Sequence, residues 1–160
     1  MKSFLIQVIV VVLIFNGVSM LKESSMLSSW QQEHAPEFLL PDLHNEPVEL
    51  ANPNKKTLVY FFAPWCSVCR VSISNLEMLY KYNPDIDIKA VVLDYQSIAE
   101  VEQFAKNLDL TFPILLGNQN VKQAFKVSAY PSYYVLDKNG AIEHRSLGYS
   151  TALGLYLRSL

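Results

Sequence analysis

Net charge and cysteine are both scarce in this sequence, and each scarcity narrows the functions open to the chain. The 160 residues carry a formal charge of −2, with no basic stripe and no acidic tail, so the composition does not favour nucleic acid as a partner. Internal repeats and low-complexity tracts are also lacking in the sequence. A chain of this length is expected to form one domain with a core of its own.

Cysteine occurs only twice, at Cys66 and Cys69, within the stretch FFAPWCSVCR. The three histidines are scattered along the chain: His34, His44 and His144. A structural zinc site needs four ligands at a recognisable spacing, which this set does not supply. Covalent haem attachment needs a histidine directly after the second cysteine, where Arg70 stands. A peroxidase with a single cysteine after a threonine does not fit either, so a redox-active pair or a structural disulfide remains.

The longest apolar stretch lies at the beginning of the chain, in MKSFLIQVIVVVLIFNGVSML at 1–21. Lys2 and the terminal amine precede it, which is typical of an export signal. As a helix, the part from Phe4 to Leu21 would span roughly 27 Å, just under the ~30 Å hydrocarbon core. We therefore expect a retained membrane anchor, with a cleaved signal peptide or a buried core helix as the alternatives.

Positive charge before an apolar segment keeps that end in the cytoplasm, so the rest of the chain is expected on the far side of the membrane. In bacteria this is the periplasm or its equivalent, where disulfides persist. Residues 22–33 are polar and serine-rich and are expected to form a tether. The domain is then expected to extend over 34–160.

Strand and helix patterns alternate through this domain. The expected strands are two short ones around an HNEP turn within 36–50, then 57–63, 86–93, 112–116, 132–136, and a closing hairpin through Asn139-Gly140. The expected helices are 66–82, a capped helix from Ser97 to about Leu108, 118–125, and a last helix to Leu160 that Ser150 or Thr151 caps. This order predicts an α/β sandwich with a mixed central sheet.

The buried strand TLVYFFA at 57–63 leads directly into the two cysteines, which open the next helix. At a helix start, residues i and i+3 lie on one face, with Cα atoms within the ~4.4–6.8 Å that a disulfide accepts. Free amides and the helix dipole should lower the pKa of Cys66 and make it the nucleophile. Cys69, one turn further in, should keep a higher pKa and resolve the mixed disulfide.

The strand TLVYFFA, the motif APWCSVCR and the later AYPSYYVLD together resemble the thioredoxin superfamily, in particular its membrane-anchored TlpA/ResA-like disulfide oxidoreductases. The resemblance covers 35 to about 160. It implies a thioredoxin-like three-layer sandwich with a mixed central β-sheet, an N-terminal β-hairpin and a central strand–helix insertion at 86–108. It also implies a thiol-disulfide oxidoreductase that reduces protein disulfides.

Specific residues follow from this resemblance. Trp65, Cys66 and Cys69 match the active-site motif, and Tyr130-Pro131 matches the family's cis-proline, which lies beside the disulfide and holds substrate backbone. We therefore expect Cys66, Cys69 and Pro131 to be catalytic and Trp65 and Tyr130 to bind substrate. Neither metal nor organic cofactor is expected. The expected partners of this monomer are envelope proteins with thiols or disulfides and a membrane or periplasmic redox partner.

The chain also departs from the family pattern. Tyr60 stands where thioredoxins proper carry a buried aspartate that moves protons to the second cysteine, and Asp94 and Glu100 are weak candidates for that role. Ser132 replaces the glutamate of the cytochrome c maturation branch, which speaks against that branch. Tyr130 is bulky for its position, so it either narrows the substrate groove or packs. A binding module with an inert disulfide is the alternative function.

Overall fold

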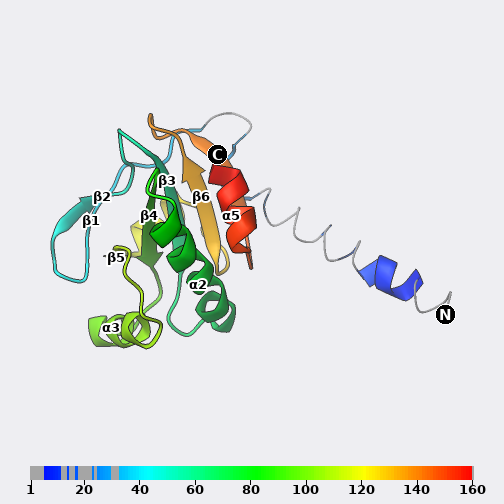
Figure 1. Ribbon diagram of the computed structural model, residues 1–160, viewed down its shortest axis with the longest axis horizontal. Coiled ribbons are helices and arrows are strands. Elements are labelled where there is room, and N and C mark those ends of the chain that lie inside the picture. Colours follow the sequence, from blue (N-terminus) through cyan, green and yellow to red (C-terminus); the bar gives the residue numbers. More distant parts are fainter. Residues whose placement is uncertain are drawn as a thin grey trace.

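The computed structural model describes residues 6–11, 14, 17, 23, 25–29 and 33–159 of the chain (Figure 1). Residues 6–11, 14 and 17 are helical, and the remainder of the predicted anchor at 1–21 lies outside the described residues. Within the part of the chain that is described, no helix has both the length and the apolar character needed to cross a bilayer.

A five-stranded mixed sheet forms the centre of the domain, in the order β5-β4-β3-β6-β7. Its strands are β3 (Lys56–Phe62), β4 (Ile86–Val92), β5 (Ile114–Leu116), β6 (Ser132–Leu136) and β7 (Ile142–Leu147). The middle strand, β3, runs parallel to β4 and antiparallel to β6. An antiparallel hairpin of β1 (Leu39–Pro41) and β2 (Pro47–Glu49) precedes the sheet, as predicted.

In the described part of the domain, four helices accompany the sheet: α2 (Ser67–Tyr82), α3 (Ile98–Asn107), α4 (Gln119–Ala124) and α5 (Ala152–Ser159). Figure 1 shows α2 and α5 side by side on one face of the sheet, and these two helices contact each other. Ser97 caps α3 and Asn118 caps α4, as the sequence predicts. Of the two candidate caps for α5, Thr151 is the one used, because its hydroxyl accepts the amide of Gly154 at 3.1 Å.

Two hydrophobic cores, one on each face of the sheet, explain the unbroken apolar run of β3. Tyr60 and Phe62 join the core under α2 and α5, whereas Val59 and Phe61 join the core on the opposite face. All four side chains are fully buried. A strand covered on both faces has no polar side, so its sequence cannot alternate.

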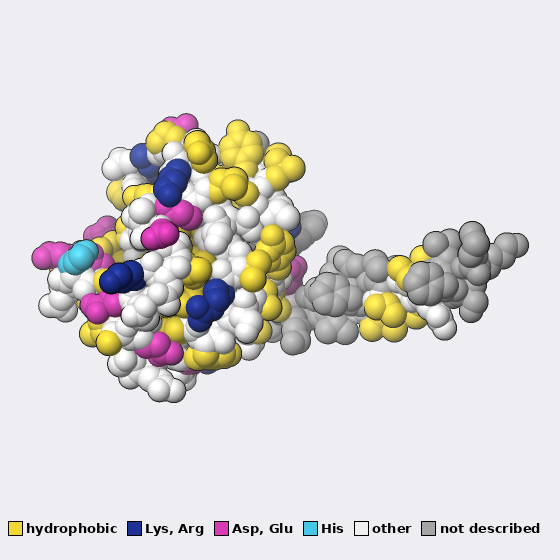
Figure 2. All heavy atoms as spheres, turned by 60° about the horizontal axis from the view of Figure 1, so that its bottom comes forward, with side chains coloured by type: hydrophobic (Ala, Val, Ile, Leu, Met, Phe, Trp, Pro, Cys, Tyr) yellow, Lys and Arg dark blue, Asp and Glu magenta, His cyan; other side chains and the backbone are white. Residues whose placement is uncertain are grey.

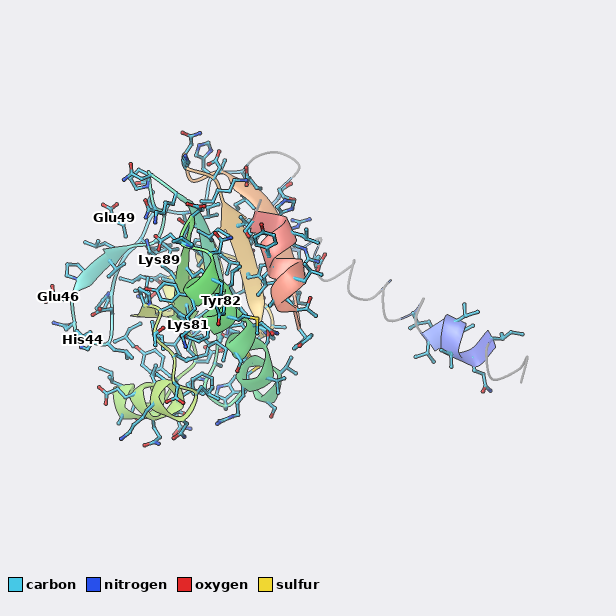
Figure 3. The ribbon with its side chains drawn as sticks, in the orientation of Figure 1. His44, Glu46, Glu49, Lys81, Tyr82 and Lys89 are labelled. Atoms are coloured by element: carbon cyan, nitrogen blue, oxygen red, sulfur yellow. A yellow bond between two sulfur atoms is a disulfide. The ribbon has the colours of Figure 1, made fainter. Side chains whose placement is uncertain are left out.

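The hairpin is attached to the sheet by polar contacts around Lys89 of β4. This buried lysine forms an ion pair with Asp87 at 3.0 Å and donates a hydrogen bond to the main-chain carbonyl of Glu49 in β2 (Figure 3). Asn52 donates to the same Asp87 carboxylate at 2.9 Å. A buried ammonium is tolerated here because both an anion and a carbonyl satisfy it.

The turn between β6 and β7 is wider than the two-residue turn that Asn139-Gly140 suggested. Only Gly140 of this pair has a positive φ, at 81°. The Asp137 carboxylate accepts the amides of Asn139 at 2.8 Å and Ala141 at 2.7 Å. The aspartate side chain therefore organises this turn, as aspartate does in many loops.

Part of the predicted tether docks on the domain. Met26 and Leu27 are each only 3% exposed and join the core that contains Phe125 and Tyr134. Arg145 donates to the carbonyls of Met26 at 2.8 Å and Leu27 at 2.7 Å. The polar composition of 22–33 did not predict this contact. Residues 22, 24 and 30–32 lie outside the described part of the chain, and the domain boundary at residue 34 stays a prediction.

Candidate active site

One edge of the central sheet collects the residues that the sequence marks as functional. Because β3 and β4 are parallel, their carboxyl ends lie at the same edge, and the amino end of antiparallel β6 meets them there. The cysteine motif follows β3, Asp94 follows β4, and Tyr130-Pro131 precedes β6. Figure 2 turns the lower side of Figure 1 forward and shows patches of hydrophobic side chains between charged ones on this face.

Cys66 and Cys69 form a disulfide, with Cα atoms 5.2 Å apart as the sequence spacing predicts. Cys66 is the N-cap of α2, with φ −77° and ψ 109°, and its sulfur accepts a hydrogen bond from the amide of Cys69 at 3.1 Å. The Cys66 carbonyl accepts the amide of Arg70, which closes the first turn. Cys66 therefore lies where unpaired helix amides concentrate positive potential.

The two sulfurs differ in burial. Cys66 is 7% exposed and Cys69 is fully buried in the core under α2. Of the two cysteines, only Cys66 therefore reaches solvent, and the roles of attacking and resolving thiol stay predictions.

The Tyr130-Pro131 peptide bond is cis, as the family resemblance implied. The Pro131 carbonyl accepts the amide of Gly148 at 2.7 Å, and the Ser132 hydroxyl donates to the carbonyl of Ala129 at 2.7 Å. These bonds fix the backbone on both sides of the proline, at the edge where the disulfide lies.

Two aromatic rings meet at this edge. Trp65 is 60% exposed, and its ring centroid lies 5.7 Å from that of Tyr130 with an interplanar angle of 78°. The Trp65 indole N–H donates to the main-chain carbonyl of Asp94 at 2.9 Å. This edge-to-face arrangement is the favourable geometry for aromatic pairs. Tyr130 therefore packs against Trp65 instead of projecting freely into solvent.

Asp94 is the centre of a polar network at this edge. Its carboxylate accepts hydrogen bonds from Tyr130 at 2.9 Å and Gln119 at 3.1 Å, and it forms a short ion pair with Lys122. Burial acts to raise the pKa of Asp94, but the bonds from Lys122, Tyr130 and Gln119 outweigh burial and hold that pKa below its usual value. Burial raises the pKa of Tyr130 most, and the hydrogen bond to Asp94 and the Asp94 charge raise it further.

These contacts bear on which acid assists Cys69. The carboxylate of Asp94 is held ionised by its partners, so it is a poor proton donor. Glu100 belongs to the capping box of α3: its carboxylate accepts the amide of Gln96 at 2.9 Å, and its amide donates to Ser97. Both acids therefore have structural partners of their own.

Two buried hydroxyls without a hydrogen bond in the described part of the chain belong to Tyr60, in the core that contains Cys69, and to Ser72, on the same helix as Cys69. Tyr60 and Ser72 are both fully buried, and neither hydroxyl has hydrogen-bond geometry to a partner among the residues described. Ser72 lies three residues after Cys69, on the same face of α2. Burial raises the pKa of Tyr60, and the nearby Ser72 hydroxyl offsets part of that rise.

Cys66, Cys69 and Asp94 are among the residues that the sequence marks as candidates, whereas Lys122, Gln119 and Ser72 are not. Lys122 and Gln119 come from α4 and approach Asp94 only in the folded chain, so no spacing signal marked them. A sequence signal for Ser72 did exist. This serine lies three positions after Cys69 in α2, and helix residues at that offset share a face.

Comparisons with known proteins agree with this geometry. A model of the AhpC/TSA family matches residues 32–145. Thioredoxin-like protein YneN of Bacillus subtilis is 31% identical over 94% of this chain and 93% of its own length. Thiol-disulfide oxidoreductase ResA of Geobacillus kaustophilus is 31% identical over 73% of this chain and 69% of its own. The crystal structure of StoA from Bacillus subtilis superposes with a TM-score of 0.72 at 26% identity, covering 79% of this chain and 98% of that one.

The family match spans well over half of the chain, and the predicted thioredoxin-like sandwich is confirmed by the superposition. The disulfide at the start of α2 supplies the redox group that such proteins need. The chain therefore belongs to the AhpC/TSA family and is a thioredoxin-like thiol-disulfide oxidoreductase.

Proposed function

We propose that this oxidoreductase reduces disulfides of proteins outside the cytoplasm through a cycle of the Cys66–Cys69 pair. The observation that carries the proposal is the placement of the Cys66 sulfur at the N-terminus of α2, where it accepts the amide of Cys69 at 3.1 Å. A helix N-terminus stabilises the thiolate, which is the form that attacks a disulfide.

The reaction needs two exchange steps. The Cys66 thiolate attacks one sulfur of the partner's disulfide, which forms a mixed disulfide and releases one partner thiolate. The Cys69 thiolate then attacks the Cys66 sulfur, closes the intrachain disulfide and releases the second partner thiolate. Two electrons pass to the partner, whose thiolates take protons from water. A redox partner with a dithiol returns the pair to the reduced form.

The edge around the pair would receive the partner's chain. Pro131 presents fixed backbone at the same edge of the sheet as the disulfide, because its carbonyl and the flanking Ser132 are held by hydrogen bonds. Trp65 and Tyr130 offer aromatic surface beside it. We assign Pro131 to alignment of the partner's backbone and the two aromatic residues to binding of its side chains.

The location outside the cytoplasm rests on the apolar stretch at 1–21 and the positive charge before it. A retained anchor at the periplasmic face of the membrane is the preferred form, with release after signal cleavage as the alternative. Disulfides persist in such compartments, so a reductase has substrates there.

Reduction of insulin disulfides by the purified domain tests the proposal. Turnover with a recycling dithiol is expected for the wild type and is expected to be lost in Cys66→Ser. A wild-type chain that never turns over would indicate a binding module with an inert disulfide. The direction of electron flow is read in cells by alkylation and gel shift: a dithiol at steady state supports a reductase, and a disulfide supports an oxidase.

A further inference from the structure

Asp94 connects three segments that are far apart in the sequence. It is the second residue after β4, and its backbone adopts the left-handed conformation with φ 49°. Its main-chain carbonyl accepts the indole N–H of Trp65, from the loop between β3 and α2, at 2.9 Å. Its side chain accepts the hydroxyl of Tyr130, from the loop before β6, at 2.9 Å. Gln119 and Lys122 of α4 complete the network.

The backbone conformation of Asp94 serves both contacts at once. Left-handed residues are uncommon outside glycine, and aspartate and asparagine tolerate this conformation better than other side chains. With φ 49°, one residue directs its carbonyl to Trp65 and its carboxylate to Tyr130. The two aromatic residues that flank the disulfide and the cis-proline are thus bound to the same residue.

Lys122 makes the network electrically balanced. It pairs with the Asp94 carboxylate, and its ammonium lies 5.6 Å from the centre of the Tyr130 ring. The ring is therefore held by its hydroxyl, by the cation over its face and by the edge-to-face contact with Trp65. These three contacts keep the Tyr130 side chain in one orientation when a partner binds.

We propose that Asp94 is a positioning residue of the oxidoreductase site, which holds Trp65 and Tyr130 as one fixed aromatic wall beside the Cys66–Cys69 disulfide. This inference rests on the proposed reduction of protein disulfides. The wall contributes to binding of the partner protein and not to sulfur exchange itself. Among the described residues, the contacts that hold Asp94 are to Trp65, Tyr130 and α4, and not to the cysteines. The exposed part of the wall is apolar, with Trp65 60% and the neighbouring Val68 48% exposed. The partner segment that fits it carries an apolar side chain next to its cysteine.

A small dithiol and a protein disulfide distinguish positioning from chemistry. Dithiothreitol reacts with the Cys66–Cys69 disulfide without needing an aromatic wall, whereas a protein partner must dock on it. A residue that only positions the wall is expected to change KM for the protein substrate and to leave kcat almost unchanged. The reaction with dithiothreitol is expected to change less than the reaction with the protein.

Two variants remove the hydrogen bond between Tyr130 and Asp94, one by changing the acceptor and one by changing the donor. Asp94→Gly deletes the carboxylate and keeps the left-handed backbone, which glycine adopts without strain. Tyr130→Phe deletes only the hydroxyl. Each is expected to raise KM for insulin about three- to tenfold, the range that follows from the loss of one hydrogen bond of ordinary strength. Asp94→Asn keeps an acceptor for Tyr130 and is expected to recover most of the loss.

Asp109→Gly is the matched control. Asp109 is exposed, has the same φ of 49° and lies in the turn after α3, so the substitution makes the same backbone change outside the network. Its KM is expected to equal that of the wild type.

The results separate the two proposals. If the wild type reduces insulin and Asp94→Gly, Tyr130→Phe and Asp109→Gly all have the same KM, the positioning role alone is overturned. Equal losses with dithiothreitol and insulin would also overturn it, because they would place Asp94 in the exchange chemistry or in folding. A wild type that reacts with dithiothreitol but reduces no protein disulfide would overturn the proposed function, and this inference with it.

Discussion

The main-chain amide of Cys69 donates a hydrogen bond to the sulfur of Cys66 across 3.1 Å, within the first turn of α2. In the reduced protein the same amide faces a thiol that can ionise. Hydrogen bonds from helix amides favour the charged form, so the pKa of Cys66 is expected to fall below the ~8.5 of a free cysteine. The pKa is measured from the rate at which iodoacetamide alkylates the reduced protein at a series of pH values. Mass spectrometry assigns the rate to each cysteine.

The same titration has an internal control, since Cys69 belongs to the same chain and the same helix. Cys69 is fully buried and should alkylate slowly at every pH at which the domain stays folded. If Cys69 proves to be the faster thiol, the assignment of attacking and resolving roles is wrong.

Mixed disulfides should accumulate in one cysteine variant and not in the other. Cys69→Ser leaves the attacking sulfur without its resolving partner, so covalent adducts with client proteins are expected to persist until a reductant is added. Cys66→Ser keeps only the fully buried sulfur and should trap few. Non-reducing gels of cells that express each variant make the comparison. Equal trapping by both would contradict the roles, and adducts in neither would favour the inert binding module.

Glu77 should give the domain a pH-dependent contribution to stability. This buried carboxylate of α2 accepts the amide of Thr111 at 2.8 Å, binds the Thr111 hydroxyl, and pairs with Lys81 at 3.1 Å. Burial acts to raise its pKa, but these contacts outweigh burial and lower the pKa below the usual value. A group with a lowered folded pKa stabilises above its unfolded pKa of ~4.3, and this stability is lost as pH falls through the folded pKa.

Glu77→Gln is therefore expected to lower the free energy of unfolding near neutral pH, by about 1 kcal/mol. The difference from wild type should shrink as the pH falls below about 4. Urea unfolding at several pH values measures both effects. Glu102→Gln, on the exposed face of α3, is the control and should follow the wild type throughout. A Glu77→Gln deficit that grows toward low pH would show that the sign is wrong.

Tyr60 and Tyr134 should respond differently to loss of the hydroxyl. The Tyr134 hydroxyl accepts the amide of Leu27 at 3.3 Å and donates to the carbonyl of Phe125 at 2.6 Å. Tyr134→Phe is expected to cost about 1–2 kcal/mol of unfolding free energy, because it leaves buried groups unpaired. Tyr60→Phe removes a buried hydroxyl that has no partner among the described residues, so it should be neutral or stabilising. Equal losses in urea unfolding would mean that Tyr60 has a partner, such as the nearby Ser72 hydroxyl or a buried water.

Local signals explain how far the sequence could predict this fold. The strand at 57–63 was recognisable because residues on both of its faces are buried, and Ser97 with Glu100 marked the start of α3 through a capping box that the structure contains. The cysteine pair was recognisable because its geometry depends on neighbours within one helical turn. Each of these features is set by residues close together in the chain.

Contacts between segments far apart in the chain could not be predicted from the sequence. The ion pair of Asp94 with Lys122 joins the loop after β4 to the short helix α4, and no periodicity encodes it. Met26 and Leu27 lie in a serine-rich stretch whose composition resembles a linker, yet tertiary contacts with Arg145 and Tyr134 hold them. Composition averages over such isolated apolar residues, so only the folded arrangement identifies them.

The docked N-terminal segment would also fix the direction in which the redox pair faces if the chain is anchored. The Glu23 carboxylate accepts the Ser146 hydroxyl at 3.2 Å and the Leu147 amide at 3.3 Å. Leu147 pairs with Ser132, the residue after the cis-proline, so this junction lies at the catalytic edge of the sheet. For a chain anchored through residues 1–21, only Lys22 would separate the bilayer from that junction. The catalytic edge with its disulfide would then lie close to the lipid surface. Disulfides of membrane-embedded proteins could meet it there, whereas soluble proteins would first have to diffuse to the membrane.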